Sequence, residues 1–306
     1  MRIAVIDCGT NTFNLLIADV LHGKIYYRFR TKRVVKLGEN GISKGIIGDV
    51  PRERALMALK DFTQIIKQRK VEVVKAVGTA ALRDAKNGTA LLKKIKSATG
   101  LEIELIDGKQ EANYIYEGVK EAISLGDRTS LIIDIGGGSV EFIIGNASKL
   151  FWKKSFRIGA ARLIEDFQPS DPINKPEILS LNQYLLQQLE PMLVAVKKYQ
   201  PDNLIGSSGS FDTFAAIIMH SQGTPNRLKR ETTYQFKLSE YKLLHKELVQ
   251  STYKERLKMP GMLRMRADMI MTASLLLTFV LHETGIKKLS LSTYALKEGL
   301  MKSLVQ

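Results

Sequence analysis

The sequence predicts an α/β protein that contains two related domains, and three observations support this fold class. The 306 residues exceed the usual size of one domain. One strand-turn-strand pattern occurs twice, as IAVIDCGTNTFNLLI at 3–17 and SLIIDIGGGSVEFII at 130–144. Segments with strand and helix periodicity also alternate along both halves. Because the offset of 127 residues is too long for a solenoid, the repeat indicates a duplicated domain.

The repeated pattern is a β-hairpin with a small, polar turn. Each copy has an apolar strand, an aspartate, a turn that contains glycine and hydroxyl residues, and a second apolar strand. The matched pairs are Asp7 with Asp134, Gly9 with Gly136, and Thr12 with Ser139. We therefore expect one anion-binding hairpin in each half.

Strands and helices follow the first hairpin in alternation. The segment 51–69 begins with Pro51 and has apolar residues on one helical face. Asn87 and Gly100 are suitable caps for a helix over 88–99. The predicted strands of this half are 24–31, 71–77 and 101–106, and its last predicted helix is about 109–125.

The second half repeats this organisation. Its predicted strands lie near 131–135, 140–145, 150–156 and 203–205, and its long helices near 177–199 and 265–284. The strand at 203–205 leads into the segment Gly206-Ser-Ser-Gly-Ser210. The stretches 168–176 and 221–232 are polar and rich in turn residues, so we expect loops there.

Composition excludes several classes of protein. Cys8 is the only cysteine, which excludes an intrachain disulfide and a multi-cysteine zinc site and suits a reducing cytoplasm. The longest apolar stretch, 269–281, is shorter than the roughly 20 residues of a membrane span, and we expect no membrane partner. With 46 Lys and Arg against 31 Asp and Glu, the net charge of +15 favours a polyanionic ligand or provides a solubilising surface.

The two turns predict a phosphate site. Glycines let backbone N–H groups approach phosphate oxygens, and hydroxyl groups add further donors. An aspartate beside such a turn would repel phosphate unless a divalent cation or an ordered water lay between them. Asp7 and Asp134 thus indicate metal-assisted phosphate chemistry. The turn residues concerned are Gly9, Thr10, Thr12, Gly136, Gly137, Gly138 and Ser139.

Three further charged residues lie close to predicted strand ends. Arg83 follows the strand at 71–77, where its planar fork could bind two phosphate oxygens or remain on a solvated surface. Glu111 in the first turn of a helix either stabilises the helix dipole or acts as the base for an attacking water. Strand alternation places Glu141 on the same face as Ser139.

These segments together resemble the exopolyphosphatase and guanosine pentaphosphate phosphatase family, which has the superfold of actin, sugar kinases and heat-shock chaperone ATPases. The resemblance follows the order and spacing of DCGTNTFN at 7–14, GTAALR at 78–83, EANYIYEG at 111–118, DIGGGSVE at 134–141 and GSSGS at 206–210. Segments at 155–163, 266–270 and 295–300 extend it through the whole chain.

The resemblance implies two actin-like, ribonuclease H-like domains, 1–125 and 126–294, with a cleft between them and a last helix, about 295–306, that packs back onto the first. It implies water attack on a terminal phosphate of polyphosphate or guanosine pentaphosphate, with Mg²⁺ or Mn²⁺ as the cofactor. Glu111 would activate the water, Arg83 would bind the terminal phosphate, and Glu141 and Asp134 would hold the ion or that water. Asp7, which stands beside the first turn as Asp134 does beside the second, is expected to be a further metal ligand. The expected phosphate-binding residues are Gly9, Thr10, Asn11, Thr12, Gly136, Gly137, Gly138, Ser139 and Gly209.

The chain departs from longer relatives in two ways. Those relatives continue into helical, HD-like domains, and we expect this chain to lack one. Lys297 stands where many relatives carry arginine, which keeps the charge but loses the planar fork.

Two basic clusters are expected to guide a polyanion to the cleft. One comprises Lys149, Lys153, Lys154 and Arg157, and the other comprises Arg227, Lys229 and Arg230. Either cluster could instead be an ordinary solvated surface.

Two rival functions stay open at this point. An ATP-dependent kinase of the same superfold would use the same turns but needs an adenosine pocket. A non-catalytic sensor of polyphosphate or an alarmone would keep the turns without needing Glu111. No nucleic-acid-binding module is visible, and a homodimer is left open.

Overall fold

The computed structural model describes residues 1–225, 227–229 and 231–305 and contains two mixed β-sheets. The first sheet contains β1 (Arg2–Cys8), β2 (Thr12–Leu21), β3 (Lys24–Val34), β4 (Val73–Gly78) and β5 (Ile103–Leu105). The second contains β6 (Ser130–Ile135), β7 (Val140–Gly145), β8 (Leu150–Phe156), β9 (Asn203–Ser207), β10 (Thr233–Phe236) and β11 (Lys288–Ser292).

The helices of the first half are α1 (Asp49–Gln68), α2 (Ala80–Asp84), α3 (Gly88–Thr99) and α4 (Gly108–Ala122). The second half contains α5 (Ala160–Phe167), α6 (Lys175–Gln188), α7 (Glu190–Tyr199), α8 (Ser208–Ser221), α9 (Leu238–Gln250), α10 (Tyr253–Arg256), α11 (Ile270–Thr284) and α12 (Leu296–Ser303). Two short 3₁₀ helices lie at Arg227–Lys229 and Arg264–Arg266.

The two sheets have matching strand orders. The first is β3-β2-β1-β4-β5, and the second, taken from its β8 edge, is β8-β7-β6-β9-β11-β10. In both, the predicted hairpin is antiparallel and its first strand also pairs in parallel with a later strand, β4 or β9. This correspondence confirms the duplicated, actin-like α/β fold that the sequence predicts.

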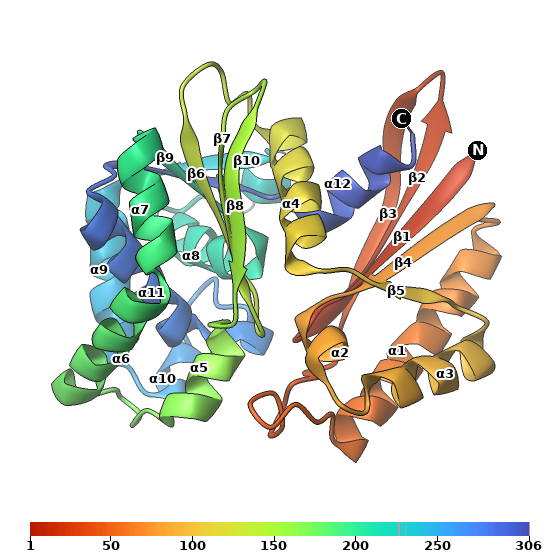
Figure 1. Cartoon of the computed structure of the whole chain (residues 1–306), viewed down its shortest axis with the longest axis horizontal. Coiled ribbons are helices and arrows are strands. Elements are labelled where there is room, and N and C mark those ends of the chain that lie inside the picture. Colours follow the sequence, from red (N-terminus) through yellow and green to blue (C-terminus); the bar gives the residue numbers. More distant parts are fainter. Residues whose placement is uncertain (226, 230, 306) are drawn as a thin grey trace.

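The molecule is layered, with α4 and α12 between the two sheets (Figure 1). One face of the first sheet packs on α1 and α3, and the outer face of the second packs on helices of the second half. The opposite faces of both sheets share a third core with α4 and α12, in which Val5 of β1 and Ile132 of β6 take part. Hydrophobic contact across this middle layer therefore joins the two halves.

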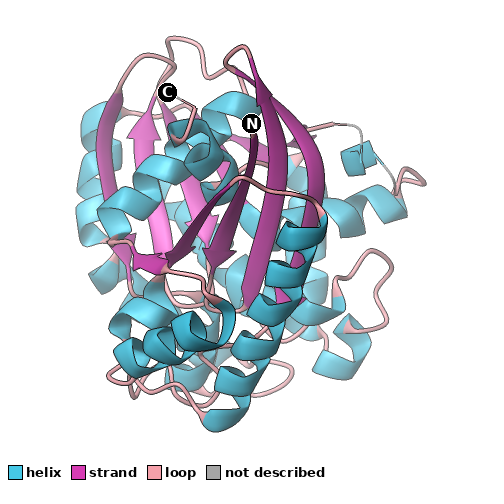
Figure 2. Ribbon diagram, turned by 90° about the vertical axis from the view of Figure 1, so that its right-hand side faces the viewer, coloured by secondary structure: helices cyan, strands magenta, loops and turns pink. Residues whose placement is uncertain are grey.

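The last helix is in close backbone contact with α4. A Cβ atom added to Gly299 would lie 1.8 Å from the carbonyl oxygen of Tyr114, and one added to Gly118 would lie 2.0 Å from that of Ala295. Because only glycine permits this approach, α4 and α12 need both residues. Both chain termini lie at the same end of the molecule (Figure 2). The domain boundaries at 125/126 and 294/295 stay predictions.

The structure corrects several predicted elements. The helix predicted at 177–199 is two helices, because Pro191 begins a new helix and leaves Leu189 between them. The helix predicted from 265 begins at Ile270 and is preceded by a 3₁₀ turn. Part of the predicted loop at 221–232 is a 3₁₀ helix, while Arg230 lies outside the described residues. Across the part of the chain that is described, no helix is long and apolar enough to cross a membrane.

Candidate active site

A cavity of about 520 Å³ lies where the two hairpin turns meet α4, α8 and α12. It is lined by every predicted phosphate-binding residue, by the proposed base and by all three predicted metal ligands. These residues are Gly9, Thr10, Asn11, Thr12, Gly136, Gly137, Gly138, Ser139, Gly209, Glu111, Asp7, Asp134 and Glu141. The structure thus brings together residues that are more than 200 positions apart in the sequence.

Strand alternation explains why the carboxylates face this cavity. Asp7 lies two residues beyond Val5, whose side chain belongs to the middle core, so its carboxylate leaves β1 on that face. Asp134 has the same relation to Ile132 of β6. Asp134 and Glu141 are also directly opposite one another across the β6–β7 ladder. The hairpin register therefore places the carboxylates of the second half side by side.

The two turns share their backbone geometry. Gly9 N–H donates to the carbonyl of Thr12 at 3.1 Å, and Gly136 N–H donates to that of Ser139 at 3.1 Å. The turns also touch each other, since a Cβ atom on Gly138 would lie 2.7 Å from Thr10 Oγ1. The contact between the two turns therefore requires glycine at position 138.

Burial makes the four carboxyl groups hard to ionise. It raises the pKa of Asp7 to about 6 and, with the charge of Asp134, that of Glu141 to about 7. Burial also raises the pKa of Asp134, and burial together with Glu141 raises the pKa of Glu111 well above its ordinary value. A divalent cation beside the four groups would favour their ionised forms.

Glu111 is held at the start of α4. Asp107 caps this helix by accepting from the backbone N–H groups of Lys109 and Gln110, and Gln110 completes a capping box. Glu111 lies in the first turn of α4, just after this cap, and is 7% exposed. The cap thus fixes the end of the helix that presents the proposed base.

Arg83 lies behind Glu111 and is not among the residues that line the cavity. Its Nη1 donates to the carbonyl of Ile106 at 2.9 Å and lies 3.4 Å from Glu111 Oε2. Its Nε donates to Asp84 Oδ1 at 3.3 Å. Among the predicted catalytic residues, Arg83 therefore contacts the proposed base Glu111. Its contact with phosphate stays a prediction.

A basic wall, defined as Lys32, Arg266 and Lys297, lines the cavity around Asp212. Burial raises the pKa of Asp212 to about 6, against the opposing effect of Lys297 and the other two cations. Arg266 lies over Gly209, where a Cβ atom would come within 2.4 Å of the guanidinium. Gly209 therefore provides room for this arginine.

Comparison with known protein families matches residues 16–306 to the Ppx/GppA phosphatase family. The chain therefore belongs to the Ppx/GppA phosphatase family. The match begins within β2, so β1 and the first turn lie outside it, while the second hairpin lies inside it. It confirms the resemblance that the motifs indicate.

Two Ppx/GppA structures are similar to this one over its whole length. An exopolyphosphatase from Cytophaga hutchinsonii is 40% identical, with a TM-score of 0.97, over 100% of this chain and 98% of that one. The family member from Aquifex aeolicus is 28% identical, with a TM-score of 0.82, over 100% of this chain and 97% of that one.

Two curated Ppx/GppA relatives carry different substrate names. Exopolyphosphatase 1 of Mycobacterium bovis is 27% identical over 305 residues, which are 98% of this chain and 87% of that protein. The guanosine-5'-triphosphate,3'-diphosphate pyrophosphatase of Aliivibrio fischeri is 26% identical over 302 residues. These are 99% of this chain but only 59% of that protein.

The carboxylates of this Ppx/GppA site fit a divalent cation as a partial ligand set. Within 1–225, 227–229 and 231–305, no three His, Cys, Asp or Glu side chains converge closely enough to hold a metal ion alone. Mg²⁺ in phosphate chemistry commonly uses one or two carboxylates and completes its shell with water and substrate phosphate. Asp7, Asp134 and Glu141 offer buried carboxylate oxygens beside the turns, which suits that mode.

Sequence reasoning missed part of this Ppx/GppA cavity. Lys32, Asp212 and Arg266 come from an edge strand, a helix and a 3₁₀ turn, and no local motif marks them as site residues. For Asp212 and Arg266 the available signal was their position next to or within the segments 206–210 and 266–270 that carry the resemblance, and Lys32 had no such signal. Asn11, which was predicted to bind phosphate, also donates through Nδ2 to the carbonyl of Met265 at 3.3 Å.

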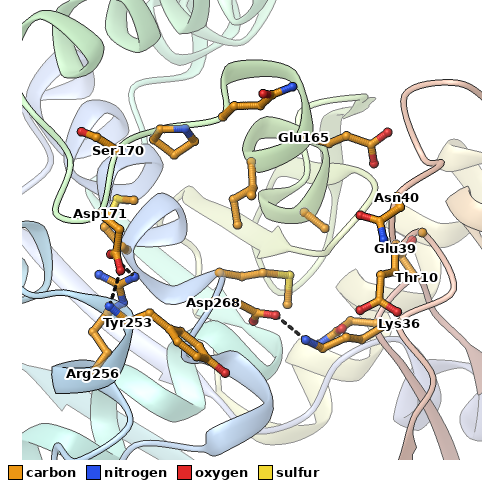
Figure 3. A pocket seen from close by; sticks show the side chains of 18 residues that line it. Thr10, Lys36, Glu39, Asn40, Glu165, Ser170, Asp171, Tyr253, Arg256 and Asp268 are labelled. Atoms are coloured by element: carbon orange, nitrogen blue, oxygen red, sulfur yellow. Dashed lines mark hydrogen bonds and ion pairs between the residues drawn. The ribbon is translucent and has the colours of Figure 1, made fainter.

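A second cavity, of about 620 Å³, shares Thr10 and Asn11 with the first (Figure 3). Lys36 pairs with Asp268 there at 2.5 Å, and Arg256 pairs with Asp171 at 2.8 Å. Because these charges are paired with one another, the smaller cavity, which contains both turns and a group of buried carboxylates, is the candidate active site of this Ppx/GppA protein.

Proposed function

We propose that the protein hydrolyses a terminal phosphoanhydride bond of inorganic polyphosphate or guanosine pentaphosphate and releases orthophosphate. The observation that carries this proposal is the convergence of both glycine-containing turns with Glu111 in one cavity. Binding alone would need the turns but would not need a buried carboxylate at the helix start. Family membership supports the same reaction class.

The turns bind the terminal phosphate through backbone N–H groups and hydroxyls. Thr10 and Thr12 on one side, with Ser139 on the other, offer hydroxyl donors within the cavity. Donors aimed from two sides stabilise charge that develops on the phosphoryl oxygens during transfer.

Glu111 orients the attacking water and accepts its proton. A carboxylate with a raised pKa is a stronger base than an ordinary glutamate, so its burial favours this role. The guanidinium of Arg83, 3.4 Å away, opposes this shift and lowers the pKa of Glu111 in part. Arg83 thereby supports the base, in addition to the phosphate contact proposed for it.

One or two of the carboxylates Asp134, Glu141 and Asp7 would hold Mg²⁺ or Mn²⁺, and water and substrate oxygens would complete its shell. When bound, the ion supplies charge neutralisation for the phosphate oxygens. The chain itself fixes these carboxylates: Ser207 Oγ donates to Asp134 at 3.0 Å, Ser155 Oγ to Glu141 at 2.6 Å and Asn14 Nδ2 to Asp7 at 3.0 Å.

The basic wall of Lys32, Arg266 and Lys297 binds the remainder of the polyanion. Burial opposes the charge of Lys297, but Glu298, Asp212 and Asp7 together raise its pKa, so it remains a cation. No Phe, Tyr or Trp is among the described side chains that line the cavity. Charge rather than base stacking therefore dominates recognition here.

The same absence of aromatic side chains weighs against the kinase alternative, since an adenosine pocket commonly includes such a surface. The apolar side chains that line the described part of this cavity are all aliphatic: Leu15, Ile115, Ile135, Ala216, Leu228, Leu263, Ala295 and Leu296. A kinase would also require an acceptor, whereas a hydrolase needs water alone.

The test is a substrate comparison with purified protein and Mg²⁺. Orthophosphate release is measured from tripolyphosphate, a long polyphosphate and guanosine pentaphosphate, each without any acceptor. ADP formation is measured from ATP with and without glycerol or acetate as acceptor. Release from any of the first three without acceptor supports the proposal. Turnover of ATP that depends on an acceptor, with no release from the other substrates, would establish the kinase instead.

A further inference from the structure

Arg162 is a buried arginine to which the reaction described above assigns no role. It lies in the first turn of α5 and is 5% exposed. Its Nε donates to the carbonyl of Gly138 at 3.2 Å, and its Nη1 donates to the carbonyl of Ile42 at 3.1 Å. Its Nη2 lies 3.6 Å from Asp84 Oδ2. One guanidinium thus contacts the second turn and two segments of the first half.

The segment that contains Ile42 is bonded to the first turn. Val35 N–H donates to the carbonyl of Asn11 at 3.0 Å, and Leu37 N–H donates to that of Thr10 at 2.7 Å. A shift of this segment would therefore move the first turn. Arg162 reaches that turn through it.

The start of α5 is bonded to the second turn by its backbone. Ala160 N–H donates to the carbonyl of Gly136 at 2.9 Å, and Ala161 N–H to that of Gly137 at 3.0 Å. The backbone of Arg162 is consequently fixed relative to the second turn. Its side chain contacts Ile42 and Asp84 of the first half from this fixed position.

Glu165, one helical turn further along α5, adds a second contact with the same segment. Its carboxylate accepts from the N–H groups of Ile42 at 3.2 Å and Ser43 at 3.3 Å. Both polar backbone groups of Ile42 are therefore bound by α5, one by an arginine and one by a glutamate. These bonds on two sides fix both the orientation of Ile42 and its distance from α5.

Asp84 extends the contact to the proposed base. Its Oδ2 faces Arg162 and also lies 3.1 Å from Arg157 Nε, while its Oδ1 accepts from Arg83 Nε. Arg83 in turn lies beside Glu111. The series Arg162, Asp84, Arg83, Glu111 thus joins the second turn to the base by charged contacts.

We propose that Arg162 is a positioning residue that sets the spacing between the two phosphate-binding turns and, through Asp84, the orientation of Arg83 beside Glu111. The inference rests on the proposed hydrolysis for its effect on rate. The partners of Arg162 are the backbone carbonyls of Gly138 and Ile42 and the carboxylate of Asp84, which belong to three different segments. One planar guanidinium that contacts all three fixes their relative positions, which apolar packing alone would not do.

The first experiment measures steady-state hydrolysis of a short substrate, tripolyphosphate, with Mg²⁺. Arg162→Gln removes the charge and the fork, and Arg162→Lys keeps the charge but cannot reach all three groups. Because small displacements of catalytic groups cost up to about 100-fold, we expect kcat to fall roughly 10- to 100-fold in Arg162→Gln. We expect KM to change less than about threefold and Arg162→Lys to recover part of kcat.

Arg256→Gln is the matched control. Arg256 is also buried, at 3% exposed, and its guanidinium bonds the carbonyls of Ser251 and Ala267 within the second half, away from both turns. Its loss should lower the unfolding temperature about as much as that of Arg162, with kcat per folded molecule close to wild type. A merely structural role for Arg162 predicts equal effects of the two changes.

A second readout does not depend on activity. Hydrogen exchange followed by mass spectrometry should show faster exchange in the peptides over 36–43 and 136–140 for Arg162→Gln and Asp84→Asn, but not for Arg256→Gln. Wild-type kcat together with unchanged exchange in both Arg162 variants would overturn the proposal. If the wild-type protein releases no phosphate, the proposed function fails, and the exchange comparison alone decides about Arg162.

Discussion

The proposed base is the most consequential single residue. Glu111→Gln keeps the shape of the side chain but removes the basicity, so turnover should fall by roughly 10²- to 10⁴-fold while substrate still binds. Steady-state kinetics and equilibrium binding of polyphosphate together measure this. A variant with nearly normal turnover would remove Glu111 from the mechanism.

The buried carboxylates predict a pH-dependent effect of Mg²⁺ on stability. Folding raises the pKa of Asp7 from 3.8 to about 6 and that of Glu141 from 4.5 to about 7. Groups with raised pKa values stabilise the metal-free fold below pH about 4 and lose that contribution as pH rises through 6 to 7. A divalent cation compensates the charges that then develop.

The increase in Tm on adding Mg²⁺ to chelator-treated protein should therefore be small at pH 5 and largest above pH 7. Thermal unfolding at paired pH values, with and without Mg²⁺, gives this difference. Glu141→Gln should reduce the increase and stabilise the metal-free protein at pH 8. An increase in Tm that is the same at pH 5 and pH 8 would contradict the assignment of these carboxylates to the ion.

Site residues that belong to a sequence motif could be predicted. Those that reach the cavity only through the tertiary fold could not. Asp7 and Asp134 were predicted from the internal repeat, because each follows an apolar strand at the same place in its hairpin. Arg266 and Lys32 have no such local pattern and reach the cavity only through long-range packing. The contact of Arg83 with Glu111 likewise depends on how α2 lies against α4, which periodicity does not specify.

At the scale of elements, the contact between α4 and α12 holds the helix that carries Glu111. Gly299→Ala would place a methyl group 1.8 Å from a backbone carbonyl of α4, so the helices must separate. We expect a loss of about 1–3 kcal/mol in the free energy of unfolding, measured by urea denaturation. Ser303→Ala, on an exposed position of the same helix, is the control and should change that free energy by less than about 0.5 kcal/mol. Equal effects of the two substitutions would show that the close approach is unimportant.

The bounds of helices and strands could be predicted from the sequence wherever the hydrophobic periodicity and the capping or turn residues agreed. The hairpins, α1 and α3 were predicted close to their observed bounds because each has a clear pattern and an identifiable end. The single helix predicted at 177–199 was wrong because apolar periodicity continues across Leu189 although Pro191 restarts the helix. The strands β10 and β11 were not predicted, because each is short and their positions in the sheet depend on long-range pairing of β11 with β9 and of β10 with β11.

At the scale of the whole molecule, the net charge of +15 predicts how affinity depends on substrate length. A long polyphosphate meets more of the basic surface than a trimer does, so its KM should be lower and should rise more steeply with salt. Leu228 lines the cavity, which places the segment Arg227–Lys229 at its edge. Kinetics over a salt series for both lengths measure the effect.

Two double variants distinguish a specific effect of the segment Arg227–Lys229 on KM from the effect of the total surface charge. Arg227→Gln with Lys229→Gln should raise KM for the long chain and leave kcat nearly unchanged. Lys197→Gln with Lys198→Gln removes the same charge from the last turn of α7 and should change KM much less. If both pairs raise KM equally, only the total charge matters and the segment has no specific role.

The central claim is that water attacks the terminal phosphorus in the cavity between the two halves, and hydrolysis in ¹⁸O-labelled water tests it most directly. Mass spectrometry of the products from tripolyphosphate with Mg²⁺ locates the label. The mechanism predicts one ¹⁸O atom in the released orthophosphate and none in the pyrophosphate that remains. Label in the pyrophosphate instead, or no cleavage by protein shown to be folded and loaded with Mg²⁺, would contradict it.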